Sequence, residues 1–374
     1  MALPYHVLSD FMFAKADKAG IPLSGTFELT ARCNLNCRMC YIHRKSNDSA
    51  AQKQERSSSD WLDLAAQCQK HGTLLLLLTG GEPLLRPDFR EIYSGCKKLG
   101  LFLSINSNGS LIDDDTVRFF ASDPPARVNI SLYGVSPETY AALCDDASAY
   151  HRTVHAILAL QKAGIPVKLN FSATPWNKDD LPAVFEFSRK HDLPLQVASY
   201  MFPPVRTCEL GCCEPQRLSP TDAAALQITY DKLRFSPEEL RRRWADQLKG
   251  LSAPEPESEC QELPTERIRC RAGSSVFWVT YNWDLRPCGM MTTPSVSLMD
   301  MGFAQAWEEI HTARQQIITP AKCTSCPIRN TCDRCAAIYY AETGSYSEPA
   351  PYLCEKARAY LELAREQLPL LRDS

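Results

Sequence analysis

Three cysteines lie within eight residues in the stretch CNLNCRMCYIH, residues 33–43. Cys33, Cys37 and Cys40 are separated by three and then two residues, so all three can point inward from one loop. Thiolates are the ligands of iron–sulfur clusters and of structural zinc. A closed tetrahedral site needs four ligands, and three leave one position open for a substrate or cofactor. The spacing therefore predicts a cluster with one open iron, or a zinc site completed by a residue such as His43.

A second motif, TGGEP at residues 79–83, follows a leucine-rich stretch. Its two glycines allow a ligand to approach the backbone closely, and Pro83 suits the first position of a following turn or helix. Alone the motif is a turn. Beside the cysteine loop it predicts a second wall of the same pocket.

The C-terminal region is also rich in cysteine. Two C-x-x-C pairs in CTSCPIRNTCDRC indicate a zinc ribbon or iron–sulfur ligands. Cys260 lies upstream, and Cys208, Cys212 and Cys213 form a further group that is either redox-active, incidental or cluster-binding. The seven cysteines of the C-terminal region are Cys270, Cys288, Cys323, Cys326, Cys332, Cys335 and Cys354.

The elements that must position these residues alternate regularly. Apolar stretches typical of buried strands are separated by amphipathic stretches typical of helices, which predicts βαβ units and a parallel sheet, open or closed into a barrel. Ligands bind at the carboxyl ends of such strands, where both motifs lie. Strands are expected at 25–31, 73–79, 101–109, 127–134, 165–173 and 193–201, and helices at 57–72, 86–100, 113–122, 151–164 and 180–191.

Composition narrows the class of protein. The chain has 374 residues, a formal net charge of −3 and only one basic run, RRRW, so nucleic acid is not an expected partner. The N-terminus lacks the features of a signal peptide, and no apolar run is long enough to cross a membrane. Seventeen cysteines without an export signal favour metal binding or catalysis in a reducing cytoplasm over a disulfide framework.

The cysteine spacing with an aromatic residue after the third cysteine, GGEP after the second strand, and the six-strand α/β core resemble the radical S-adenosylmethionine (SAM) enzymes. The resemblance implies a partial (β/α)6 barrel with a 4Fe-4S cluster whose open iron binds SAM. Reductive cleavage of SAM would give a 5′-deoxyadenosyl radical that abstracts a hydrogen atom from the substrate. Cys33, Cys37 and Cys40 would bind the cluster.

The same resemblance assigns SAM contacts. Tyr41 would lie near the adenine, and the backbone of residues 80–82 would hold the methionine amino group. Three further residues fall where the family contacts the ribose and carboxylate of SAM. The full set of implied SAM contacts is Tyr41, Gly80, Gly81, Glu82, Asn108, Ser131 and Arg152.

The seven C-terminal cysteines resemble the SPASM extension of radical SAM enzymes, a small cysteine-rich domain that holds two auxiliary 4Fe-4S clusters. A distal cluster would take Cys323, Cys326, Cys332 and Cys354, and a nearer one Cys270, Cys288 and Cys335, with its fourth position filled by Cys260 or left open. The implied division is an N-terminal extension (1–23), the radical SAM core (24–205), a helical connector and linker (206–268), the SPASM domain (269–356) and a C-terminal helix (357–374).

The chain departs from the SPASM pattern at three places. Trp283 stands where a glycine is usual, and CDRC leaves two residues where three are usual. Cys288 is followed by Gly289, where the anaerobic sulfatase-maturating members carry an aspartate as general base. Sulfatase-type oxidation is therefore not expected.

The resemblance favours maturation of a ribosomally synthesised peptide, by a thioether or other crosslink or by epimerisation. The expected partners are a precursor peptide and an electron donor such as flavodoxin or ferredoxin. About two dozen residues precede the first strand, too few for a leader-binding domain, so a separate leader-peptide-binding protein or direct recognition is expected. The alternatives are a radical SAM enzyme of small-molecule cofactor biosynthesis and a non-catalytic zinc or iron–sulfur scaffold. The sequence identifies no proton-transfer residue.

Overall fold

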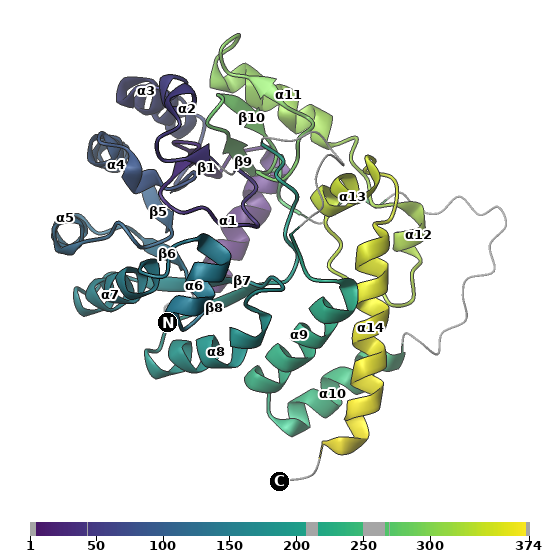
Figure 1. Cartoon of the computed structure of the whole chain (residues 1–374). Coiled ribbons are helices and arrows are strands. Elements are labelled where there is room, and N and C mark those ends of the chain that lie inside the picture. The colour runs from purple at the N-terminus through teal and green to yellow at the C-terminus, as the bar shows by residue number, and fades with distance from the viewer. Residues whose placement is uncertain (1–4, 43, 207–215, 250–265, 269, 372–374) are drawn as a thin grey trace.

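The computed structural model describes residues 5–42, 44–206, 216–249, 266–268 and 270–371 (Figure 1). Their main sheet has nine strands in the order β11-β10-β9-β1-β4-β5-β6-β7-β8. Six strands run parallel in the order β1, β4, β5, β6, β7, β8, and helices cover their outer side in Figure 1. The predicted alternation of strands and helices and the parallel α/β sheet are confirmed.

The elements of this half lie within a few residues of the expected bounds. Those strands are β1 (Ser24–Glu28), β4 (Leu75–Thr79), β5 (Phe102–Ser107), β6 (Arg127–Ser131), β7 (Val167–Ser172) and β8 (Leu195–Ala198), with the short pair β2 (Arg32–Cys33) and β3 (Arg44–Lys45). The helices are α1 (Tyr5–Ala19), α2 (Ser49–Lys53), α3 (Ser58–Lys70), α4 (Phe89–Lys98), α5 (Asp114–Ser122), α6 (Pro137–Cys144), α7 (Ala149–Lys162) and α8 (Leu181–Lys190).

Local chemistry explains these boundaries. Ser57 begins α3 with a capping box, in which its side chain accepts from the Asp60 amide and the Asp60 carboxylate accepts from the Ser57 amide. In α4 the apolar residues recur on one face and are buried, while the other face is polar. In β4, Leu76 and Leu78 are buried in the core on one face, and Leu75 and Leu77 are half-buried on the other. The main core lies between this sheet and the helices.

The C-terminal region extends the same sheet instead of forming a sheet of its own. β9 (Val276–Val279) pairs in parallel with β1, with Ser24 opposite both Leu75 and Val276. β10 (Asp284–Arg286) and β11 (Val296–Ser297) follow antiparallel. The cysteine-rich region is thereby joined to the first strand of the core, the strand that leads to Cys33. The domain boundaries themselves remain a prediction.

Trp283, where the SPASM pattern has glycine, occupies the turn between β9 and β10 with a φ of 71°. This is the left-handed region that a glycine favours and a tryptophan rarely adopts. The indole packs edge-on against Trp61, 4.8 Å between ring centroids, which offsets the cost of that backbone conformation. Trp283 therefore adopts a backbone conformation that a glycine at this position would adopt without strain.

The helical connector predicted from about residue 219 is confirmed as α9 (Pro220–Arg234) and α10 (Pro237–Leu248). Both lie beside α14 (Pro351–Gln367) in Figure 1. The expected start of the C-terminal helix at residue 357 is wrong: Pro351 begins it, because proline suits the first turn. The remaining helices are α11 (Phe303–Arg314), α12 (Ala321–Thr324) and α13 (Ala336–Thr343). The linker expected at 251–264 lies outside the described residues.

Within the described ranges, every helix is too short or too polar to span a membrane.

Candidate active site

The cysteine loop leaves the carboxyl end of β1 and is held by the backbone of α6. The amides of Asn36 and Arg38 donate to the carbonyls of Cys144 and Leu143, at 3.1 and 3.0 Å. The Cys40 amide donates to the Cys37 carbonyl at 3.1 Å, which closes a tight turn between two of the cysteines. The loop is therefore a fixed structure that gathers three thiols.

The pKa values of two thiols of this loop, Cys33 and Cys37, are raised above their usual range. Burial, with the nearby Glu82 carboxylate as a second cause, raises the pKa of Cys33 well above its usual range. Cys33 Sγ nevertheless accepts from the Leu35 amide at 3.4 Å and from Asn108 Nδ2 at 3.6 Å. N–H donors of this kind stabilise a metal-bound thiolate, and metal binding would displace the thiol proton.

Cys144 was not identified from the sequence. It is buried at the end of α6, and a thiol–thiol hydrogen bond with it is the largest cause that raises the pKa of Cys37. A lone cysteine in AALCDD carries no ligand spacing. Only the fold brings Cys144 to the loop.

The two glycines of GGEP are required by close packing against the exit of β1. A Cβ on Gly80, whose φ is +146°, would lie 2.4 Å from the Thr30 carbonyl oxygen, and one on Gly81 would lie 2.3 Å from that of Arg32. The Gly81 and Glu82 amides donate to the same two carbonyls, at 2.8 and 2.9 Å. The two predicted walls are thus in direct contact.

Glu82 is fully buried and serves as the centre of this wall. Its carboxylate accepts from the Asn108 amide at 2.8 Å, from the Leu84 amide at 3.1 Å and from Ser107 Oγ at 3.0 Å. Burial raises its pKa to about 7 despite these donors. Glu82 therefore links the ends of β4 and β5 through its side chain, in addition to the backbone role expected for residues 80–82.

This raised pKa predicts a pH dependence. Between the ordinary carboxyl pKa and about 7 the folded state binds more protons than the unfolded state, so the free energy of unfolding falls as pH rises through that window. A shift of this size corresponds to a fall of about 3 kcal/mol. Urea unfolding of the cluster-free protein between pH 4.5 and 7.5 measures it. In Glu82→Gln the side chain does not ionise, so the free energy of unfolding should no longer decrease over this pH range. An unchanged decrease in that variant would show that another group causes it.

The other residues expected to contact SAM lie at different depths around the cysteine loop. Asn108 is buried beside the loop, with Nδ2 donating to Asn34 Oδ1 at 2.9 Å. Ser131 ends β6 and its carbonyl faces the Tyr140 hydroxyl at 3.5 Å. Arg152 lies one layer further out, since it donates to the Ser110 carbonyl and forms an ion pair with Asp146 at 2.7 Å. Asn108 and the loop come together directly, and Arg152 reaches them only through Ser110.

Tyr41 faces the C-terminal region. Burial is the main cause that raises its pKa, and charges at Glu28, Cys40 and Cys288 are near enough to contribute. The guanidinium of Arg206 lies over its ring, 5.6 Å from the centroid. Tyr41 is therefore the residue at which the first cysteine loop meets the segment that carries Cys288.

The cysteines expected to bind the nearer auxiliary cluster lie together. Cys270 and Cys335 both act electrostatically on Cys288, whose pKa burial raises to about 11. Cys335 precedes the first residue of α13; burial raises its pKa, and the nearby backbone N–H groups of Ile338 and Ala337 act in the opposite direction. Such a helix N-terminus stabilises a thiolate.

Arg314 is a second residue that the sequence did not reveal. It is buried on α11 and donates to the carbonyls of Ile268, Cys270 and Ala272, at 3.0, 2.9 and 3.2 Å. A single side chain thereby fixes the loop that presents Cys270. No spacing in the sequence relates residue 314 to that loop.

The four cysteines assigned to the distal cluster also gather. Cys323, Cys326 and Cys354 all contribute to raising the pKa of Cys332 to about 12, after burial as the main cause. Among the described residues, no three Cys, His, Asp or Glu side chains converge where one metal ion would bind. That finding leaves a cubane open, because each of its irons takes a different thiolate.

The model of the Radical SAM superfamily matches residues 27–188, the segment from β1 to α8 that carries both walls of the site. The chain therefore carries a radical SAM domain. It spans most of an AdoMet-dependent heme synthase from Methanosarcina barkeri, at 26% identity over 87% of this chain and 94% of the relative.

Two further comparisons extend beyond the radical SAM domain. The sporulation killing factor maturation protein SkfB of Bacillus subtilis is 24% identical over 76% of this chain and 64% of its own. SuiB of Streptococcus suis, in a crystal structure bound to the precursor peptide SuiA, matches with a TM-score of 0.64 over 95% of this chain and 82% of its own, at 18% identity. The radical SAM enzyme described here therefore shares the fold of SuiB, cysteine-rich region included.

Radical SAM enzymes bind SAM and a 4Fe-4S cluster, and the residues of this one fit them. Three thiols with N–H donors at Cys33 match a cluster with one open iron. Among described hydrogen bonds, neither the Gly80 nor the Gly81 carbonyl has a donor, so both can accept from an ammonium group. His43, Cys208, Cys212, Cys213 and Cys260 lie outside the described residues.

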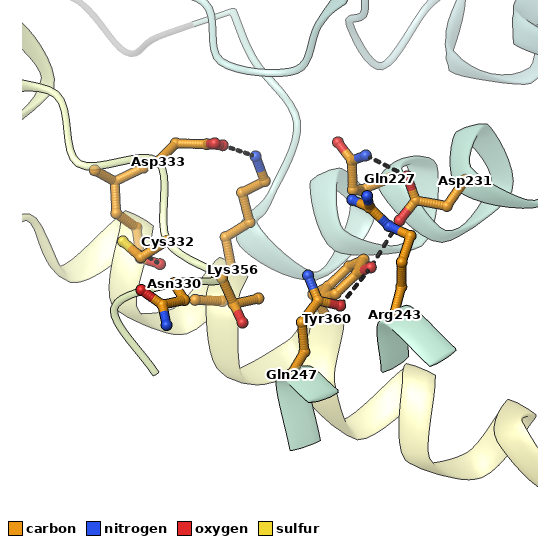
Figure 2. A pocket seen from close by; sticks show the side chains of 12 residues that line it. Gln227, Asp231, Arg243, Gln247, Asn330, Cys332, Asp333, Lys356 and Tyr360 are labelled. Atoms are coloured by element: carbon orange, nitrogen blue, oxygen red, sulfur yellow. Dashed lines mark hydrogen bonds and ion pairs between the residues drawn. The ribbon is translucent and has the colours of Figure 1, made fainter. Parts of the chain in front are cut away.

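A separate cavity of about 200 Å³ borders Cys332, one of the four cysteines expected at the distal cluster (Figure 2). α9, α10 and α14 line it together with the loop of Cys332 and Asp333, whose carboxylate pairs with Lys356 at 2.7 Å. None of its lining residues belongs to the strand ends that carry Cys33 and Gly80. It is therefore not the candidate active site.

Tyr360 joins the helices around this cavity. Its hydroxyl donates to Asp231 Oδ2 at 2.6 Å and accepts from Trp244 Nε1 at 3.1 Å. Tyr360→Phe leaves both buried groups without this partner and is expected to lower the free energy of unfolding by about 1–3 kcal/mol. Urea unfolding measures the change.

Tyr340→Phe is the matched control, because its hydroxyl has no hydrogen bond to a described residue. It is expected to cost less than about 0.5 kcal/mol. Equal effects of the two substitutions would contradict the network around Tyr360.

Proposed function

We propose that this radical SAM enzyme modifies a residue of a ribosomally synthesised peptide. The observation that supports the proposal is that Arg206 bridges the first cysteine loop and the segment of Cys288: its amide donates to the Tyr41 carbonyl at 3.1 Å, and its guanidinium donates to the Gly289 carbonyl at 2.5 Å. A peptide residue bound at this junction would lie between the two cysteine groups. SuiB shares the fold over most of the chain and its structure contains a precursor peptide, and SkfB is a maturation protein.

The cofactors supply the radical chemistry. Cys33, Cys37 and Cys40 would hold a 4Fe-4S cluster whose open iron takes SAM, and the two cofactors together would supply a carbon radical able to abstract a hydrogen atom from the substrate. We assign the two auxiliary clusters as expected from the sequence, with Cys270, Cys288 and Cys335 nearer and Cys323, Cys326, Cys332 and Cys354 distal. An electron carrier such as flavodoxin or ferredoxin would supply the reductant.

The residues of the chain prepare this chemistry. Glu82 and Asn108 tie the SAM wall to the cysteine loop, so the two sides of the pocket keep one geometry. Tyr41 and the ion pair of Glu28 and Arg206 line the side of the site toward Cys288, and the two charged side chains are themselves shielded from water.

Co-expression with candidate precursor peptides tests the proposal. Mass spectrometry of the peptide is expected to show a changed mass, or deuterium incorporation from D₂O if a stereocentre is inverted. The variant with Cys33, Cys37 and Cys40 replaced by alanine is the control and should leave the peptide unmodified. Modification by that variant would exclude radical initiation at this loop.

Cofactor biosynthesis is the second candidate, because the heme synthase aligns over 94% of its length. Heme production by the purified enzyme, measured by absorbance, would favour it over peptide modification.

A further inference from the structure

Three buried N–H donors around Gly289 have no acceptor. They are Nη1 of Arg206, Nη1 of Arg286 and Nε1 of Trp278, each inaccessible to water and without a hydrogen bond in the described part of the chain. Buried donors are nearly always paired, and leaving one unpaired is costly. Three at one place indicate a ligand group that accepts hydrogen bonds.

Contacts with the segment after Cys288 bring the three donors together. Nη2 of Arg206 donates to the Gly289 carbonyl. Trp278 packs on Gly289: a Cβ there would lie 2.7 Å from Cε2, the carbon bonded to Nε1. Arg286 is opposite Trp278 in the pairing of β10 with β9.

The charged partners of the two arginines occupy other nitrogens. Glu28 accepts from Nε and Nη2 of Arg206, at 3.2 and 2.9 Å. Asp284 accepts from Nη2 of Arg286 at 3.1 Å, and Ser295 Oγ from its Nε at 3.1 Å. Both Nη1 groups therefore remain available although both ion pairs are formed.

The indole of Trp278 fills the space that a side chain at residue 289 would need. That space therefore holds an N–H donor, Trp278 Nε1. Two guanidinium groups and an indole offer donors and no acceptor, which suits an anionic oxygen. The position can bind a negative group but cannot remove a proton.

We infer that Arg206, Arg286 and Trp278 bind a carboxylate of the substrate beside Cys288. This inference rests on the proposed function. If the substrate is a peptide, the bound carboxylate belongs to an acidic residue next to the residue that is modified. The carboxylate would fix which residue lies at the junction between the two cysteine groups.

Ligand-observed NMR on the anaerobically reconstituted full chain with SAM tests the inference. The probes are acetyl-Ala-Glu-Ala-amide, its neutral match acetyl-Ala-Gln-Ala-amide, and the non-peptide carboxylate valerate. The glutamate peptide is expected to bind at least about tenfold more tightly than the glutamine peptide, from charge-assisted hydrogen bonds.

The variants assign this preference to the donors. Arg286→Gln should abolish it, and Trp278→Phe, which keeps the packing and removes one N–H, should reduce it. Arg118→Gln is the matched control, because Arg118 is an exposed arginine on α5, and it should leave the preference unchanged. A preference that survives Arg286→Gln would overturn the inference.

The remaining outcomes separate the site from the function. Binding of valerate that depends on Arg286, without binding of either peptide, would support the carboxylate site and reject the peptide substrate. Equal binding of both peptides would keep the peptide substrate and overturn the site. Weaker SAM binding in Arg286→Gln, with the glutamate preference intact, would assign the donors to SAM and also overturn it.

Discussion

Replacing Cys33, Cys37 and Cys40 together by alanine is expected to lower the iron content of the anaerobically purified enzyme from about twelve to about eight atoms per chain, by the stoichiometry of three 4Fe-4S clusters. Dithionite-driven formation of 5′-deoxyadenosine should fall below detection. The reason is that these thiols belong to one fixed loop, and the two other cysteine groups lie on different segments.

The control for this experiment is Cys68→Ala with Cys96→Ala. Both thiols are buried in the core between α3 and α4, where they pack as small apolar groups. Iron content and SAM cleavage should stay as in the unmodified chain. Colourless protein containing zinc, or equal iron in the triple variant and the unmodified chain, would contradict the cluster assignment at the first loop.

Arg206→Met is expected to give the largest loss of stability. Arg206 and Glu28 are essentially inaccessible to solvent and form a two-pronged ion pair. Removing the cation leaves the Glu28 carboxylate buried without its charged partner, which costs about 3–5 kcal/mol. The free energy of unfolding in urea, measured anaerobically, is the readout.

Two variants show whether the unpaired charge causes this loss. Glu28→Gln combined with Arg206→Met removes both charges and should recover most of the stability. Arg118→Met removes one partner of the exposed pair with Asp115 and should cost less than about 1 kcal/mol. A double variant as unstable as Arg206→Met alone would show that packing, and not the buried charge, is decisive.

The radical SAM half could be predicted because its signals are local. Leucine runs, capping serines and the three-cysteine spacing each depend on neighbouring residues, and the structure has the expected strands and helices in order. The contact between the cysteine loop and GGEP follows from parallel strands ending at one edge. The positions of the two motifs after neighbouring strands were therefore sufficient to predict that they form two walls of one site.

The rest depends on contacts between distant segments. Cys144, Arg314 and the donor group around Gly289 come from different elements, and no periodicity relates them. Pairing of β9 with β1 was also not foreseen, because three short strands in a cysteine-rich region resemble loops. Register between remote strands is set by packing, which one sequence does not display.

Hydrogen transfer from the substrate tests the central claim most directly. A fully deuterated peptide, chosen by the co-expression experiment, is incubated with the reduced enzyme and unlabelled SAM, and 5′-deoxyadenosine is examined by mass spectrometry. The account predicts one deuterium in 5′-deoxyadenosine formed together with modified peptide. Modified peptide accompanied by 5′-deoxyadenosine free of deuterium would contradict it.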